Sequence, residues 1–198
     1  MGAIIMMQFD CKKAEELLRE VFFTEEILEE LGVSRKEIEE VVCADAIEQI
    51  QKERMESFEL VKNFKDNMME MFPEYRFSAR LKSLPSIFGK ALRHRTLADV
   101  FGIKVVVPNK RKCYTFKKWL CEHYIVFDFE DRIKNPKFNG YKDLKIVISY
   151  QDILIEFIIQ TPSMYVDSHT IQKHSVVYPW KYHRVIRNLP AEYEYIEF

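Results

Sequence analysis

The sequence lacks the long, uninterrupted apolar run that a membrane-spanning helix needs. Such a helix takes about 18 or more apolar residues, and the longest candidate run, Ile153–Ile159, is interrupted by Glu156. Residues 1–9 are apolar but have no basic flank, no long apolar centre and no small-residue cleavage site, so no secretory signal is visible. We therefore expect a cytoplasmic protein with no membrane partner.

Cysteine is also scarce, with four residues at positions 11, 43, 113 and 121. Four widely spaced cysteines are too few for a disulfide scaffold, and no CxxC pair suggests a zinc site. Cys113, Cys121 and His123 are residue types that bind metals, but a helix over residues 111–121 would place the two thiols two turns apart. Buried free thiols are therefore the favoured interpretation.

No internal repeat, linker or low-complexity stretch divides the chain. Its 198 residues are the size of one ordinary domain, and 47% hydrophobic residues are enough for a core. We predict a single domain over residues 1–198. Within it we expect N-terminal helices (1–72), a core of mixed strands and helices (73–184) and an acidic C-terminal tail (185–198).

The net charge of −1 conceals a strong asymmetry along the chain. Residues 1–72 contain 18 acidic and 9 basic side chains, whereas residues 76–145 contain 17 basic and 6 acidic ones. A basic segment of this density suggests a polyanionic ligand, such as nucleotide phosphates or nucleic acid. A solvated surface that balances the acidic first third explains the charge equally well, so charge alone does not decide.

The first 72 residues have the apolar spacing of helices. Ser34 and Glu37 have the spacing of a capping box, and Gly32 marks the end of the helix before it. The apolar positions within 38–47 continue the capped helix. A further helical stripe continues to Pro73, and we interpret its methionines as core filler; the stripe comprises Met55, Phe58, Val61, Met68 and Met71.

After Pro73 strands and helices alternate. Strands are predicted at Tyr75–Leu81, Gly102–Val107, Leu144–Tyr150 and Ile153–Gln160, and the last two form a hairpin. Helices are predicted within Ser83–Arg93, over Arg111–His123 and from Pro162. Residues 128–140, and the end of the chain from Tyr178, are expected to be irregular. These elements predict one mixed sheet with helices around it.

Four polar residues meet where a predicted strand ends and a helix begins. Arg80 and Lys82 have the same parity and so face the same side, and Ser86 and Lys90 are four residues apart on the helix that follows. With the free N–H groups of the helix start, they suit a triphosphate. We call Arg80, Lys82, Ser86 and Lys90 the cradle.

Two carboxylates flank or interrupt the buried strands. Asp99 precedes one strand, and Glu156 stands among the apolar residues of another. A buried Glu156 must find a cation, such as Lys104 across the sheet, or shift its pKa, because burying it unpaired would cost several kcal/mol.

Each of these residues also has a purely structural interpretation. Arg80 and Lys82 could be strand-edge charges, Ser86 an N-cap and Asp99 a helix or turn cap. Taken singly, most of them would be read in this way.

Four motifs in order resemble the synthetase domain of the RelA/SpoT alarmone synthetases over about residues 76–182. They are Arg80-x-Lys82-x-x-x-Ser86-x-x-x-Lys90, Asp99-x-x-Gly102-x-Lys104, Asp131-x-x-x-x-Pro136-Lys137-x-Asn139-Gly140-Tyr141 and Glu156-x-x-Ile159-x-Thr161-x-x-Met164. The Asn-Gly-Tyr loop alone would be a weak signal, but four motifs in order are specific.

The resemblance implies an α+β fold with a mixed, mainly antiparallel, five-stranded nucleotidyltransferase-like sheet flanked by helices. It also implies transfer of the β,γ-pyrophosphate of ATP to a 3′-hydroxyl with Mg²⁺. The residues that it assigns to ATP are Arg80, Lys82, Ser86, Lys90 and Lys104, and those for the metal are Asp99 and Glu156. Oxygen ligands suit Mg²⁺, and positioning and charge stabilisation supply most of the catalysis of such a transfer.

On the acceptor side the resemblance implies two candidate catalytic residues, Glu156 and Tyr141. The glutamate helps to deprotonate the attacking hydroxyl, and the tyrosine stacks on the acceptor base. The candidate acceptor-binding residues are Tyr141, Lys137, Asn139 and Lys145. Tyr141 could instead be packed within a turn.

Departures from the family pattern cluster on the acceptor side. Lys145 stands where the family usually has a histidine, Ile158 replaces a glutamine and Gln160 replaces a basic residue, whereas the donor side changes only at Lys104, an arginine in the family. Ile158 offers neither a hydrogen-bond donor nor an acceptor, which argues against free GDP or GTP as the best acceptor.

The leading hypothesis is a toxin-like pyrophosphokinase of the small alarmone synthetase type. Its favoured acceptor is the 3′-CCA end of tRNA, whose backbone the basic segment suits. The alternative is a (p)ppGpp synthetase, a GTP pyrophosphokinase using GDP or GTP. A second alternative is a catalytically inactive RNA-binding module, against which the retained Asp99 and Glu156 argue. By analogy, a toxin implies an antitoxin protein as partner, and we interpret the acidic helices as scaffolding.

Overall fold

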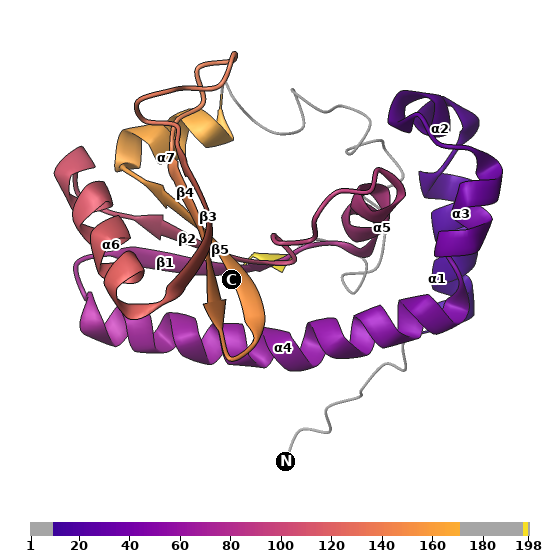
Figure 1. Cartoon of the computed structure of the whole chain (residues 1–198), viewed down its shortest axis with the longest axis horizontal. Coiled ribbons are helices and arrows are strands. Elements are labelled where there is room, and N and C mark those ends of the chain that lie inside the picture. The colour runs from indigo at the N-terminus through magenta and orange to yellow at the C-terminus, as the bar shows by residue number, and fades with distance from the viewer. Residues whose placement is uncertain (1–9, 171–195, 198) are drawn as a thin grey trace.

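The computed structural model describes residues 10–170 and 196–197 (Figure 1). In chain order the described elements are α1 (Cys11–Leu17), η1 (Leu18–Phe22), α2 (Glu25–Leu31), α3 (Arg35–Val41), α4 (Ala44–Met71), β1 (Arg76–Leu81), α5 (Leu84–Leu92), β2 (Phe101–Val106), α6 (Lys110–His123), β3 (Ile125–Asp131), β4 (Leu144–Tyr150), β5 (Ile153–Gln160), α7 (Pro162–His169) and β6 (Ile196–Glu197). The predicted α+β class, with helices before and around one mixed sheet, is confirmed.

The sheet has the strand order β3-β4-β5-β2-β1-β6. Strands β2 and β5 are parallel, and all other neighbouring pairs are antiparallel. Five longer strands therefore form the mainly antiparallel sheet that the resemblance implies. The sixth strand has two residues, which pair with Arg80 and Leu81 of β1; a segment this short carries no alternation that could reveal it in the sequence. The rest of the predicted acidic tail, 185–195 and 198, lies outside the described residues.

Strand alternation gives the sheet one apolar and one polar face. The apolar face is buried against α4 and α6, and it carries, among others, Ala79, Leu81, Ile103, Val105, Ile155, Phe157 and Ile159. The residues between them, which point the other way, include Ser78, Arg80, Gly102, Lys104 and Glu156. The polar residues that the sequence singles out on these strands thus share one face.

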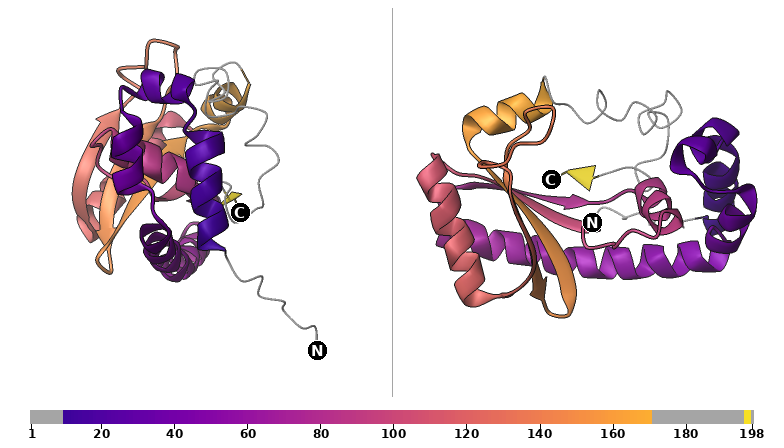
Figure 2. Two further views of the ribbon diagram at one scale, coloured as in Figure 1. Left: turned by 90° about the vertical axis from the view of Figure 1, so that its right-hand side faces the viewer. Right: turned by 45° about the horizontal axis from the view of Figure 1, so that its top comes forward.

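A second apolar cluster joins the N-terminal helices to α5. Leu84, Phe88 and Leu92 of α5 belong to the same buried cluster as Leu18 and Ile38 of the N-terminal helices. Figure 2 shows α5 between the sheet and helices α1–α3. The N-terminal helices therefore support the helix that carries Ser86 and Lys90.

The local signals at the start of the chain are confirmed, with one correction. Ser34 and Glu37 form a capping box, and Gly32 ends α2 with a left-handed φ of 69°. However, residues 38–47 are not one helix: α3 ends at Val41, Val42 is extended, and α4 starts at Ala44. Both segments bury apolar residues in the same cluster, so apolar spacing alone did not reveal the break.

The interpretation of the methionine stripe as core filler is wrong at two of its three methionines. Met55 and Met71 are 40% and 50% exposed, whereas Met68 is buried. The buried seam of α4 comprises Ile47, Arg54, Phe58, Val61, Phe64 and Met68. Arg54, next to Met55, is part of this buried seam. Apolar residues alone therefore do not locate the buried face of α4.

The expectation of an irregular segment over 128–140 is wrong at its start. Residues 128–131 belong to β3, which among the described strands pairs with β4 alone. Ile125, Phe127 and Phe129 are exposed, and the register shifts between Val126 and Asp128. An exposed edge strand with a bulge has no buried face that would produce the alternation typical of a strand. The predicted hairpin between β4 and β5 is confirmed, and Gln151 and Asp152 form its turn with positive φ.

The cysteines have different environments. Cys113 is buried, Cys11 and Cys43 are partly exposed, and Cys121 is exposed, so the interpretation of all four as buried thiols is wrong. Cys121 lies on α6 away from the buried positions Cys113, Phe116 and Leu120. In the described part of the chain no group of three His, Cys, Asp or Glu side chains could hold a metal. Nor is any described helix long and apolar enough to span a membrane.

Candidate active site

One row of the sheet holds a cation, a glycine and an acid. Strand pairing aligns Arg80 of β1 with Gly102 of β2, and Gly102 with Glu156 of β5. The two outer residues are two strand spacings apart, roughly 10 Å, yet Arg80 Nη2 lies 3.6 Å from Glu156 Oε1. A Cβ on Gly102 would lie 3.3 Å from Arg80 Nε. The missing side chain at Gly102 leaves room for Arg80 to reach the acid.

Asp99 joins the two lysines of the cradle. Its Oδ2 lies 2.7 Å from Lys82 Nζ and 2.8 Å from Lys90 Nζ. The N–H of Lys82 donates to the carbonyl of Val100, which holds the end of β1 beside the segment that carries Asp99. The three cations of the cradle are therefore in direct contact with the two acids.

Burial and charge act in opposite directions on Asp99. Burial alone would raise its pKa, but the ammonium groups of Lys82 and Lys90 outweigh burial and lower the pKa to about 2. Burial lowers the pKa of Lys82, and the carboxylate of Asp99 opposes that effect. Asp99 is therefore ionised at neutral pH.

Glu156 shows the opposite balance. Burial raises its pKa above the ordinary value, Arg80 opposes this shift and the negative charge of Asp99 adds to it. We expected Glu156 to find a cation or to shift its pKa; it has a cation partner, which is Arg80. The suggested partner, Lys104, instead contacts His169 Nε2 at 3.3 Å and lies over the ring of Tyr165.

The hydroxyl of Ser86 lies in the first turn of α5. Ser83 holds the N-cap position of this helix, so the alternative that Ser86 is an N-cap is wrong. The Ser83 hydroxyl donates to the Ser86 hydroxyl across 3.1 Å. Ser86 and Lys90 thus come to the site from the same helix.

Two carboxylates could hold a cation here. Asp99 Oδ1 is buried and accepts no hydrogen bond from the described residues, whereas its other oxygen contacts both lysines. Glu156 is the second acid in the site. Two carboxylates with one unsatisfied oxygen fit Mg²⁺, which protein sites hold through one or two carboxylates together with water and substrate phosphates.

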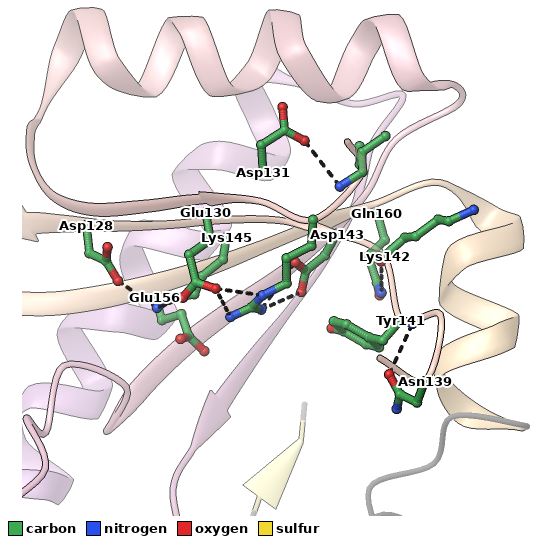
Figure 3. A network of polar contacts seen from close by, with 12 residues as sticks. Asp128, Glu130, Asp131, Asn139, Tyr141, Lys142, Asp143, Lys145, Glu156 and Gln160 are labelled. Atoms are coloured by element: carbon green, nitrogen blue, oxygen red, sulfur yellow. Dashed lines mark hydrogen bonds and ion pairs between the residues drawn. The ribbon is translucent and has the colours of Figure 1, made fainter. Parts of the chain in front are cut away.

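A chain of ion pairs runs along the acceptor side (Figure 3). Lys145 Nζ lies 2.6 Å from Asp128 Oδ2 and 2.7 Å from Glu130 Oε1. Arg132 contacts Glu130 at 2.7 Å and the buried Asp143 at 3.2 Å. Lys145, an expected acceptor ligand, is therefore already paired with two acids of β3.

The loop before β4 brings the other expected acceptor residues together. The hydroxyl of Tyr141 is hydrogen-bonded to Asp143. Burial and the negative charge of Asp143 raise the pKa of Tyr141. Lys137 Nζ lies 5.2 Å from the centre of the Tyr141 ring, and the Tyr141 N–H donates to Asn139 Oδ1. Tyr141, Lys137 and Asn139 thus form one local unit.

The two substituted positions of β5 have different surroundings. Ile158 pairs with Lys104 and, on the other side, with Lys145. With Ser78, Arg80 and others it lines a shallow pocket on the polar face. Gln160 is buried, and its Nε2 donates to the carbonyl of Lys142. Ile158 thus offers only an apolar surface to this pocket.

The sequence analysis missed three residues that support the site, and it named a fourth, Gly102, without a role. Arg54 of α4 is 1% exposed, and its Nη1 donates to the carbonyl of Lys82 across 3.0 Å. Its position, seven residues after Ile47 and four before Phe58, is helical core spacing that could have revealed it. The role of Gly102 is evident only from the pairing of the strands, and Arg132 and Asp143 are ordinary charges in the sequence.

Comparisons with known proteins agree with this geometry. Residues 79–183 match the family model described as "Region found in RelA / SpoT proteins". The protein named "Probable GTP diphosphokinase RSH3, chloroplastic" from Arabidopsis thaliana is 32% identical over 101 residues, 46% of this chain and 14% of the relative. The protein named "Probable GTP diphosphokinase RSH2, chloroplastic" from Oryza sativa is 30% identical over 118 residues, which are 54% of this chain and 16% of the relative. The chain thus spans less than a fifth of these relatives.

Two solved structures have a similar fold. The small alarmone synthetase 1 of Bacillus subtilis has a TM-score of 0.57 and 20% identity, covering 69% of this chain and 82% of its own. A GTP pyrophosphokinase family protein from Streptococcus pneumoniae has the same TM-score and identity, with 73% and 80% covered. Because the family model matches more than half of the sequence and this match includes the site, the chain belongs to the RelA/SpoT family.

Proposed function

We propose that this chain is an ATP-dependent pyrophosphokinase of the small alarmone synthetase type. It moves the β,γ-pyrophosphate of ATP to a 3′-hydroxyl. The observation that carries the proposal is the contact of the cradle with two acids: Arg80 with Glu156, and Lys82 and Lys90 with Asp99. Family membership and the folds of the small alarmone synthetases support it.

The cations of the cradle bind the phosphates of ATP. Phosphate oxygens are anionic acceptors, as are the carboxylates that these side chains contact, so Arg80, Lys82 and Lys90 can bind them in the same way. Ser86 adds a hydroxyl from the first turn of α5. Lys104 lies farther along the same face, next to the ring of Tyr165, and we assign it to the adenine end of ATP.

Asp99 and Glu156 would hold Mg²⁺, as the unsatisfied Asp99 Oδ1 supports. The ion would neutralise part of the charge of the ATP phosphates. Asp99 stays ionised because Lys82 and Lys90 keep its pKa low.

Glu156 accepts the proton of the attacking hydroxyl. The acceptor oxygen forms a bond to the β-phosphorus of ATP, the bond from that phosphorus to the α-phosphate oxygen breaks, and AMP leaves. A raised pKa makes Glu156 a better proton acceptor than an ordinary carboxylate. Tyr141 positions the acceptor base by stacking, with its hydroxyl hydrogen-bonded to Asp143.

The favoured acceptor is the 3′-CCA end of tRNA, so that the enzyme blocks translation as a toxin. Ile158 offers no hydrogen bond to a guanine edge, and Lys145 is paired with Asp128 and Glu130. Both features weaken a site for a free guanine nucleotide. The basic segment suits an RNA backbone.

A guanine nucleotide is the alternative acceptor, which would make the chain a (p)ppGpp synthetase. The names of its plant relatives, GTP diphosphokinases, favour this alternative. An inactive RNA-binding module is less well supported because both acids are retained and contact the cradle.

A toxin of this kind acts in the cytoplasm and needs restraint, so we include an antitoxin protein among its partners, by analogy. We also propose that the chain acts as one domain. Helix α5 of the synthetase core packs with the N-terminal helices in one apolar cluster, which supports a scaffolding role for residues 10–71.

Incubation of the full chain with γ-labelled ATP, Mg²⁺ and either GDP, GTP or deacylated tRNA tests the proposal. We expect the label on tRNA, with release of AMP. Label on guanine nucleotides alone would establish the alternative acceptor. No transfer to any of the three by a chain that binds RNA would favour the inactive module.

A further inference from the structure

The loop between β3 and β4 presents an aromatic side chain to solvent beside Tyr141. Phe138 is 92% exposed, more than any other large apolar side chain among the described residues. A single exposed apolar residue is common and is not evidence of a site by itself. Its position and surroundings make this one informative.

The backbone, not side-chain packing, fixes the position of Phe138. The N–H of Gly140 donates to the carbonyl of Lys137, and the N–H of Lys137 donates to the carbonyl of Tyr141. Gly140 has a φ of 78°, which favours glycine at this turn. Phe138 is thus held at the tip of a closed turn whose other end is Tyr141.

The residues of this loop carry charge of one sign. Residues 132–142 contain four cations, Arg132, Lys134, Lys137 and Lys142, and no acid, whereas Asp131 and Asp143 flank the loop. Arg132 is paired with Glu130 and Asp143, and Lys134 Nζ lies 3.8 Å from Asp131 Oδ2, but the side chain of Lys134 is 72% exposed and Lys142 is exposed. An aromatic side chain among exposed lysines is the combination with which proteins bind single-stranded nucleic acid, through base stacking and phosphate contacts.

We propose that Phe138 stacks on the base of the nucleotide that precedes the acceptor nucleotide, with Lys134 and Lys142 near the phosphates on either side of that preceding nucleotide. This rests on the proposed function, in which Tyr141 stacks on the acceptor base. A free mononucleotide has no preceding base, so Phe138 contributes only when the acceptor is the 3′ end of an RNA strand. The residue therefore distinguishes an RNA acceptor from a free nucleotide.

Stacking on Phe138 depends little on base identity. Every base has a flat π face, and the stacking residue reads no hydrogen-bond pattern. The protein should therefore require a base at the position before the acceptor nucleotide, but should accept any of the four bases there.

Fluorescence anisotropy with the full chain and a short, 5′-labelled single-stranded RNA ending in CCA tests the inference. Phe138→Ala should weaken binding about 5- to 150-fold, the range for loss of one base–aromatic stack. Phe138→Tyr should retain binding within about threefold because its ring also stacks. The matched control is Phe127→Ala, which removes another exposed phenylalanine, on β3.

Unchanged RNA affinity in Phe138→Ala, or an equal loss in Phe127→Ala, would overturn the inference. So would a change of oligomeric state in Phe138→Ala with RNA binding intact, because the residue would then contact a second copy of the chain. Binding of a non-hydrolysable ATP analogue, equal to wild type, shows that the variant is folded. If no acceptor is pyrophosphorylated but Phe138→Ala still loses RNA, the proposed function fails and the stacking role stands.

Discussion

Arg80 reaches Glu156 across Gly102, and the contact depends on the absence of a side chain between them. The three residues share one row of β1, β2 and β5, and Arg80 Nη2 lies 3.6 Å from Glu156 Oε1. Both partners are mostly buried, so the contact belongs to the interior of the site. It links a cation proposed to bind phosphate to the proposed proton acceptor.

Gly102→Ala should therefore damage the site without damaging the fold. The new Cβ would lie 3.3 Å from Arg80 Nε and displace the guanidinium. We expect affinity for an ATP analogue to fall about tenfold, since a charge-assisted contact contributes roughly 1.5–3 kcal/mol. The free energy of unfolding should fall by roughly 1–3 kcal/mol, because the loss of its cation by the buried Glu156 outweighs the preference for alanine over glycine within a strand, and the chain should still fold. Calorimetric titration and urea denaturation measure the two quantities.

Gly89→Ala is the matched control. A Cβ at Gly89 in α5 meets no atom within 4 Å. This variant should gain roughly 0.5–1 kcal/mol of stability and keep its ATP affinity. Equal ATP affinity in both variants would show that the row across Gly102 has no part in binding.

Asp99→Asn should destabilise the protein as well as weaken ATP binding. It leaves Lys82, which is nearly buried, and Lys90 without their shared anion. Removal of one partner of such a group costs roughly 3 kcal/mol. Asp66→Asn on the exposed face of α4 should change stability by less than about 0.5 kcal/mol. Chemical denaturation at neutral pH gives both values, and equal values would contradict the contribution assigned to Asp99.

The same group predicts a pH dependence of stability. The folded pKa of Asp99, about 2, lies below its ordinary value of 3.8. Its stabilisation is thus fully present above the ordinary value and is lost as the pH falls towards 2. The stability difference between wild type and Asp99→Asn should shrink over this window, as measured by denaturation at a series of acidic pH values. A constant difference would mean that the carboxylate charge is not responsible.

The pH dependence of transfer should report Glu156. The side chain accepts a proton only when ionised, and burial raises its pKa above 4.5. Activity should rise with pH as Glu156 ionises and then level off, and Glu156→Gln should be inactive while folding normally. An active Glu156→Gln would exclude the residue as the proton acceptor.

Ile158→Gln should shift acceptor choice. A glutamine restores a donor and an acceptor of hydrogen bonds to the pocket beside Lys104. Transfer to GDP or GTP should rise relative to transfer to RNA, whereas Ile158→Leu should leave the ratio near that of wild type. The ratio of labelled products measures this, and the same ratio in all three proteins would show that position 158 does not select the acceptor.

The sequence predicted much of the sheet because its buried strands alternate or are continuously apolar. It also predicted that Arg80, Lys82, Asp99 and Glu156 belong together. It did not predict the partner of Glu156, because the role of Gly102 emerges only when three strands are aligned. Lys104 is aligned two residues away, beside Ile158, and its side chain contacts α7 instead.

Other structural features were missed because the sequence analysis looked for regularly spaced apolar residues. Arg54 occupies a buried position on α4 where a hydrophobic residue is expected. Strand β3 exposes its phenylalanines at the sheet edge, so it has no alternation of burial. The ion pairs of Lys145 and Arg132 depend on β3 lying next to β4, which local sequence does not encode.

Calorimetric titration of the full chain with a non-hydrolysable ATP analogue, with and without Mg²⁺, tests the central claim most directly. We predict one site per chain, with binding that strengthens when Mg²⁺ is present and is lost in a Lys82→Ala, Lys90→Ala double variant. The account would be contradicted if the affinity for the ATP analogue were the same without Mg²⁺ and in the double variant. It would also be contradicted if the wild-type chain did not bind the analogue.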